Sequence, residues 1–110
     1  MNRLLGLVFG FLIIPAAMGS STTGTIVSVL AGEIYGNKVY IQMSPKPTLV
    51  PGCQTNARYN YVFDPTTSAG QIAFSIILAA YTANRAVYLE GTDACSLAGD
   101  VESLEQVRAL

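Results

Sequence analysis

The spacing of hydrophobic positions changes along the chain, and each change predicts an element. Residues 24–30 are rich in β-branched side chains, and residues 38–43 alternate apolar and polar positions, so both runs indicate β-strands. Gly36 and Asn37 mark a turn between them, which predicts a hairpin. The alternation assigns three side chains of the second run to the buried face: Val39, Ile41 and Met43.

A loop and a third strand follow. Residues 44–53 contain three prolines, which remove backbone donors, so we expect an irregular loop that ends at Cys53. Residues 58–63 read as a strand. Period-two alternation puts three aromatic side chains of this run on one face: Tyr59, Tyr61 and Phe63.

The second half of the chain begins with a helix. Thr66, Thr67 or Ser68 can cap its first turn, and Asn84 can end it after Ala83. Residues 85–90 predict a fourth strand whose inward side chains are Val87 and Leu89. Residues 101–110 predict a final strand, with a short helix as the alternative.

The expected order is therefore strand, strand, strand, helix, strand, strand. This is the element order of the five-stranded OB barrel, a β-rich α+β fold. A closed barrel also removes sheet edges. An open α+β sheet with one helix on its face is the main alternative.

The predicted helix is apolar on two sides. One stripe comprises Ile72, Ile76, Ala79, Ala80 and Ala83, and the other comprises Phe74, Ile77, Leu78 and Tyr81. A surface helix normally carries a single apolar stripe, so the second stripe needs a cover. We expect the stripe of Phe74, Ile77, Leu78 and Tyr81 to be an interface in a homo-oligomer. The alternative is that the loop of residues 45–51 folds over it.

The first nineteen residues differ from the rest. Arg3 precedes an apolar run over residues 4–14, and Pro15 and small residues follow, which is typical of a secretory signal peptide. The small residues Ala17 and Gly19 place the cut after Gly19 and leave one domain of residues 20–110. We therefore expect a secreted or periplasmic protein without a stable membrane anchor. An uncleaved anchor is the alternative.

The two cysteines, Cys53 and Cys95, both lie in the predicted mature part. Export places them in an oxidising compartment, where they have one possible intramolecular pairing. We expect this disulfide to stabilise the small domain by about 3 to 4 kcal/mol on the chain-entropy model.

Side chains for common chemistries are missing. The chain has no His, so it lacks the commonest general base and metal ligand, and no glycine-rich phosphate loop is present. We therefore expect no catalytic, cofactor-binding or metal residues and no enzyme activity. Asp93, Asp100 and Glu102 lie close in sequence and indicate a solvated acidic loop, with a weak calcium site as the alternative.

Charge argues against nucleic acid as a partner. One of the six basic residues, Arg3, lies in the predicted signal peptide. The mature part therefore has five basic residues against seven acidic ones, too few to bind phosphates.

The tyrosines favour another kind of partner. Tyr40 and Tyr88 lie opposite the core positions of their strands, and an apolar ring with a hydroxyl suits a sugar or a protein surface. They are the candidate ligand surface, although tyrosine is also common on exposed strand faces.

The segment "SIILAAYTANRAVYLEG", residues 75–91, carries a resemblance. It is similar to an S-x-L-L-x-A helix followed by a V-x-L/V-x-G strand in small secreted OB-fold proteins. These include the receptor-binding B subunits of bacterial AB toxins, especially the subtilase-cytotoxin type. The resemblance covers mainly residues 68–95 and implies an OB fold and a pentameric ring with its helices facing the centre. No sugar-binding residue matches, and nothing identifies a toxic partner subunit.

Together these patterns predict an exported, non-enzymatic binding or assembly module, homo-oligomeric, that recognises a glycan or protein partner. The alternative is a monomeric periplasmic or envelope accessory or inhibitor protein. A third hypothesis is an enzyme with two acids facing each other in a cleft.

Overall fold

The computed structural model describes residues 19–110. Residues 1–18, which hold nearly all of the predicted signal peptide, lie outside the described part. The elements in chain order are β1 (Ser21–Leu30), the one-turn 3-10 helix η1 (Glu33–Tyr35), β2 (Val39–Ser44), β3 (Tyr61–Phe63), α1 (Ser68–Ala83), β4 (Val87–Gly91) and β5 (Leu104–Ala109). Within this range no helix is long and apolar enough to cross a membrane.

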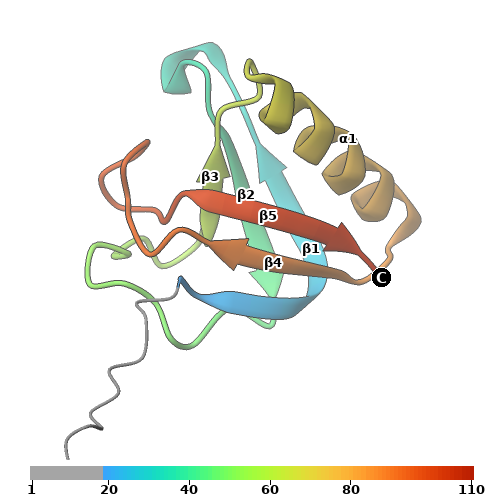
Figure 1. Ribbon diagram of the computed structural model, residues 1–110, viewed down its shortest axis with the longest axis horizontal. Coiled ribbons are helices and arrows are strands. Elements are labelled where there is room, and N and C mark those ends of the chain that lie inside the picture. The colour runs from blue at the N-terminus through green and yellow to red at the C-terminus, as the bar shows by residue number, and fades with distance from the viewer. Residues whose placement is uncertain (1–18) are drawn as a thin grey trace, which may run out of the picture.

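The five strands form one antiparallel sheet in the order β3-β2-β1-β4-β5. The central strand β1 pairs with β2 through its C-terminal half and with β4 through its N-terminal half, and an irregularity between Ile26 and Ser28 interrupts its register with β2. Such a bulge increases local twist. In Figure 1, β4 and β5 accordingly run across the direction of β2 and β3.

The two edge strands of the sheet approach each other. An isolated parallel bridge joins Val62 of β3 to Ser103, just before β5. The Val62 amide donates a hydrogen bond to the Glu102 carbonyl at 3.0 Å. The edges therefore meet at one point without forming a continuous ladder. Of the predicted barrel, the structure confirms a five-stranded antiparallel sheet with one helix and one disulfide.

The core lies between the sheet and α1. Its buried members come from β1 to β4 and from α1: Ile26, Val39, Ile41, Met43, Tyr61, Phe63, Ile77, Ala80, Val87 and Leu89. The predicted inward positions of the second and fourth strands are confirmed. The final segment is a strand, as predicted, and contributes Leu104 and Val107 to the border of the core.

The third strand is shorter than predicted. Tyr61, Val62 and Phe63 are all buried, whereas Tyr59 lies outside the strand and partly at the surface. Asn60 explains the break, because its Oδ1 atom accepts the hydrogen bond of the Met43 amide at 2.7 Å. A side chain replaces a backbone partner there, and the ladder stops. The prediction that Tyr59 shares one strand face with Tyr61 and Phe63 was wrong, because Tyr59 lies outside β3.

The helix begins and ends as predicted. Thr67 is the N-cap, and its hydroxyl accepts a hydrogen bond from the Gly70 amide at 2.9 Å. Asn84 is the C-cap in the left-handed conformation, with φ 54°. Ile77 is fully buried, and Phe74 packs edge-on against Phe63 with 5.8 Å between ring centroids.

The buried face of α1 lies between the two predicted stripes and takes residues from both. Phe74 and Ile77, which we assigned to a subunit interface, pack into the protein's own core, so that part of the assignment was wrong. Leu78 and Tyr81 from the same stripe are exposed at 40% and 43%. Residues 45–51 lie away from α1 in Figure 1 and do not cover it.

The predicted disulfide is confirmed. Cys53 and Cys95 are bonded, 42 residues apart in sequence. The bond links the long loop between β2 and β3 to the loop between β4 and β5. An intact disulfide fits an oxidising extracellular or periplasmic compartment.

Candidate functional site

Three tyrosine rings gather at one end of the sheet. Tyr40 lies on β2, Tyr35 ends η1, and Tyr59 lies in the loop before β3. The Tyr40 ring meets the Tyr35 ring edge-on at 5.5 Å between centroids and the Tyr59 ring at 5.8 Å. Edge-to-face contacts at these distances stabilise aromatic pairs. We call these three residues the tyrosine cluster.

The tyrosine cluster lines a shallow hollow of about 180 Å³. Leu30, Asn56 and Asp100 complete its wall. Within residues 19–110 none of the three tyrosine hydroxyls takes part in a hydrogen bond, so each can donate to and accept from an incoming molecule. The wall therefore combines flat apolar rings with hydroxyl, amide and carboxylate groups.

Asn56 holds the loop of the hollow in place. Its Oδ1 atom accepts hydrogen bonds from the backbone amides of Arg58 and Tyr59, both at 2.8 Å. Its Nδ2 atom donates to Asp100 Oδ2 at 3.1 Å. The Asp100 carbonyl also accepts the amides of Thr55 and Asn56, each at 3.1 Å. Two loops far apart in sequence are thus joined beside the tyrosine cluster, close to the Cys53–Cys95 bond.

The electrostatics of the hollow depend on Tyr40 and Asp100. Burial raises the pKa of the Tyr40 phenol, and the nearby Asp100 carboxylate and the Tyr35 phenol raise it further. Tyr40 therefore stays protonated and able to donate a hydrogen bond at neutral pH. The Arg58 guanidinium lies 5.6 Å from the centre of the Tyr59 ring, at the range where cation–π attraction acts.

Tyr88, the other predicted ligand residue, is not part of this hollow. In the sheet Tyr40 pairs with Leu30 and Tyr88 pairs with Thr23, so they lie near opposite ends of β1. Seven residues of strand separate those positions by about 20 Å. The Tyr88 hydroxyl donates to Glu90 Oε1 at 3.1 Å, and the Arg108 guanidinium lies 4.9 Å from its ring centre. Its polar and aromatic groups are already engaged within the protein.

The three acidic residues near the end of the chain, Asp93, Asp100 and Glu102, lie in different surroundings. Asp93 and Asp100 are exposed, which agrees with a solvated loop. Glu102 is fully buried, so its assignment to that loop was wrong. Its position in sequence, two residues before β5, gave no sign of burial. Among residues 19–110 no three His, Cys, Asp or Glu side chains lie close enough to hold a metal ion.

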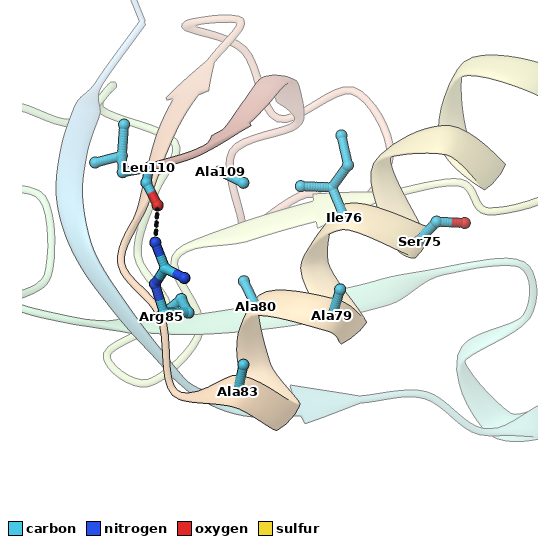
Figure 2. A pocket seen from close by; sticks show the side chains of 8 residues that line it. All are labelled: Ser75, Ile76, Ala79, Ala80, Ala83, Arg85, Ala109 and Leu110. Carbon is cyan, nitrogen blue, oxygen red and sulfur yellow. Dashed lines mark hydrogen bonds between the residues drawn. The ribbon is translucent and has the colours of Figure 1, made fainter.

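The outer side of α1 is a second candidate surface. Leu78 and Tyr81, exposed at 40% and 43%, lie on one flank of the helix, and Ile72, exposed at 64%, lies on the opposite flank. A groove of about 540 Å³ adjoins it, between the C-terminal half of α1 and the end of β5. Figure 2 shows the groove lined mainly by Ile76 and alanines, with the Arg85 side chain reaching across to the Leu110 carbonyl, a contact of 2.8 Å. This surface offers apolar contact and little hydrogen bonding.

Sequence reasoning found Tyr40 but missed most of its neighbours. Tyr35 lies in an unpredicted single turn of helix, and Asn56 and Tyr59 lie in a loop whose course depends on the disulfide. The signal available was the pair Asn56 and Tyr59 close after Cys53, because a cross-linked loop is a rigid place for binding groups. Comparison of the chain with protein-family models, curated proteins and solved structures finds no match.

Proposed function

We propose that the protein is an exported, non-enzymatic binding module that recognises a glycan at the tyrosine cluster. The observation that carries this proposal is the hollow in which the rings of Tyr35, Tyr40 and Tyr59 stand beside Asn56 and Asp100. A sugar ring presents apolar C–H faces and a rim of hydroxyls. It therefore needs flat apolar partners together with donors and acceptors.

The size of the hollow favours a small group. Pockets for drug-sized ligands have volumes of about 300 Å³ or more, whereas this hollow has about 180 Å³. A single terminal sugar residue of a longer glycan is the ligand of matching size. The tethered loops support this assignment, because a wall that is already ordered loses little conformational freedom on binding.

We also propose that the sheet forms a five-stranded OB-like barrel and that copies of the chain associate through the outer side of α1. The bridge between Val62 and Ser103 supports closure, since it connects the edge strand β3 to the residue just before β5. The exposed side chains of Leu78 and Tyr81 support association, because neighbouring exposed apolar side chains mark contact sites. The arrangement suits the toxin B-subunit resemblance, in which several copies present several binding sites.

A glycan panel tests the proposed function. Purified protein of residues 20–110, with its disulfide intact, is applied to immobilised glycans, and its mass is measured by light scattering. Binding to a defined group of terminal sugars by an oligomer supports the proposal. A monomer that binds no glycan contradicts it and favours the second candidate, a monomeric envelope accessory or inhibitor protein whose loops contact another protein.

A further inference from the structure

Glu102 is a buried carboxylate that contacts Ser20, the residue after the predicted cleavage site. Its side chain is fully buried, and it is the one charged residue among the buried side chains of residues 19–110. Its Oε2 atom accepts hydrogen bonds from the Ser20 amide at 3.1 Å and the Asp93 amide at 2.8 Å. Its Oε1 atom accepts the Ser20 hydroxyl at 2.6 Å. Three donors suit an ionised carboxylate, which can only accept.

Before the signal peptide is cleaved, the hydrogen-bond donors to Glu102 carry no positive charge. The donors to Glu102 are two peptide amides and a hydroxyl, all neutral, and no Lys or Arg is among the buried residues of the described chain. A buried charge is normally paired, because removing it from water is unfavourable by several kcal/mol. Glu102 therefore has no cationic partner among the buried residues of the described chain.

We propose that signal-peptide cleavage after Gly19 supplies that cation, as the α-ammonium group of Ser20. The Ser20 nitrogen already lies 3.1 Å from Glu102 Oε2, and Ser20 is only 2% exposed. Cleavage turns a neutral amide donor into a charged one at the same place. The new N-terminus and Glu102 form a buried ion pair that completes the mature fold.

The chemistry of the step is hydrolysis by a secretory signal peptidase. One water molecule adds across the Gly19–Ser20 peptide bond, and the bond between the Gly19 carbonyl carbon and the Ser20 nitrogen breaks. Gly19 leaves as a carboxylate, and the released amine takes up a proton. Because Ser20 is buried in the folded protein, the cut precedes folding, while the exported chain is still extended.

The surroundings of Ser20 are shaped for this N-terminus. The Ser20 hydroxyl also contacts the Tyr61 hydroxyl at 2.8 Å, and the Ser20 carbonyl accepts the Gly91 amide at 2.9 Å. A side chain at position 91 would collide with the Glu102 carboxylate, so glycine is required there. These contacts hold Ser20 in place, independently of the glycan proposal. The inference rests only on the proposed export.

The test compares two forms of the same length. One is residues 20–110 with a free Ser20 amine, and the other is the same chain N-acetylated at Ser20, which restores the neutral amide of the uncut protein. Each is also prepared with the substitution Glu102→Gln, which removes the charge and keeps the size. Urea unfolding at pH 7 is measured for all four.

We expect the free-amine form to have an unfolding equilibrium constant at least about tenfold smaller than that of the acetylated form. With Glu102→Gln, the ratio of the unfolding constants of the acetylated and free-amine forms should fall to near one. A ratio near one in the protein that keeps Glu102 would contradict the proposed ion pair. The same ratio with Glu102 and with Glu102→Gln would also contradict it.

Two measurements on the unsubstituted protein serve if Glu102→Gln fails to fold. Intact mass of exported protein should give a chain that starts at Ser20, and any other start overturns the proposal. An amine-reactive ester should label the Ser20 amine at least about tenfold more slowly in the folded protein than in urea, because the amine is buried. Equal rates would contradict burial of the amine.

Discussion

Asn56 and Asp100 are joined side chain to side chain by a hydrogen bond of 3.1 Å, although 44 residues separate them in sequence. This contact and the Cys53–Cys95 disulfide connect the same two loops. The tyrosine cluster lies where those loops meet the end of β2. Its geometry therefore depends on the cross-linked loops as well as on β2 and η1.

Removing the disulfide should destabilise the protein and loosen the hollow. The double substitution Cys53→Ala and Cys95→Ala should lower the free energy of unfolding by about 3 to 4 kcal/mol, since the bond closes a loop of about 40 residues. Urea denaturation with and without the substitutions measures the change. A loss below about 1 kcal/mol would show that the backbone contacts of Asp100 alone hold the loops together.

The two sides of α1 should respond differently to truncation. Ile77→Ala should lower stability by about 2 to 5 kcal/mol, because its side chain is fully buried against the sheet. Leu78→Ala is the matched control, and its effect should stay below about 1 kcal/mol in the monomer. Chemical denaturation of both variants at low protein concentration gives the comparison. Equal losses would mean that the helix is oriented differently.

Regular elements were predictable because their signals are local. Val39, Ile41 and Met43 occupy the inward positions that their alternation predicts, and Thr67 and Asn84 act as the caps. The orientation of α1 was not predictable in this way. Its two apolar stripes gave two possible inward faces, and tertiary packing selected the direction between them, so that Ile77 became core.

The site depends on contacts that no local pattern carries. Tyr40 was predictable as an outward residue of a strand, but its pairing with Tyr35 and Tyr59 needs the path of two irregular segments. Glu102 is the opposite case, because its charge predicted exposure. Its burial depends on Ser20, which is 82 residues away in sequence.

Tyr61 should give a distinct alkaline transition. Burial raises the pKa of its phenol to about 12. A pKa that is higher in the folded than in the unfolded state stabilises the fold below about pH 10, and this contribution is lost as pH rises towards 12. Ultraviolet titration should show one tyrosine that ionises late, and Tyr61→Phe should remove it. If the high-pH ionisation persists in Tyr61→Phe, it belongs to another tyrosine.

The proposed assembly should depend on the exposed side of α1. Leu78→Asp places a charge in the apolar contact and should convert the oligomer to a monomer with little effect on the fold. Val27→Asp is the matched control, because Val27 is 45% exposed and lies on β1. Light scattering on a sizing column reports both masses. An unchanged oligomer in Leu78→Asp would place the interface elsewhere.

We propose that the tyrosine cluster binds the ligand, and one pair of substitutions tests this directly. Glycan binding is measured for Tyr40→Ala and for Tyr88→Ala, which alter outward tyrosines on β2 and β4 that lie far apart. We expect at least about a tenfold loss of affinity for Tyr40→Ala, equivalent to about 1.4 kcal/mol, and less than about a twofold change for Tyr88→Ala. Full binding by a folded Tyr40→Ala protein, or a loss confined to Tyr88→Ala, would contradict it.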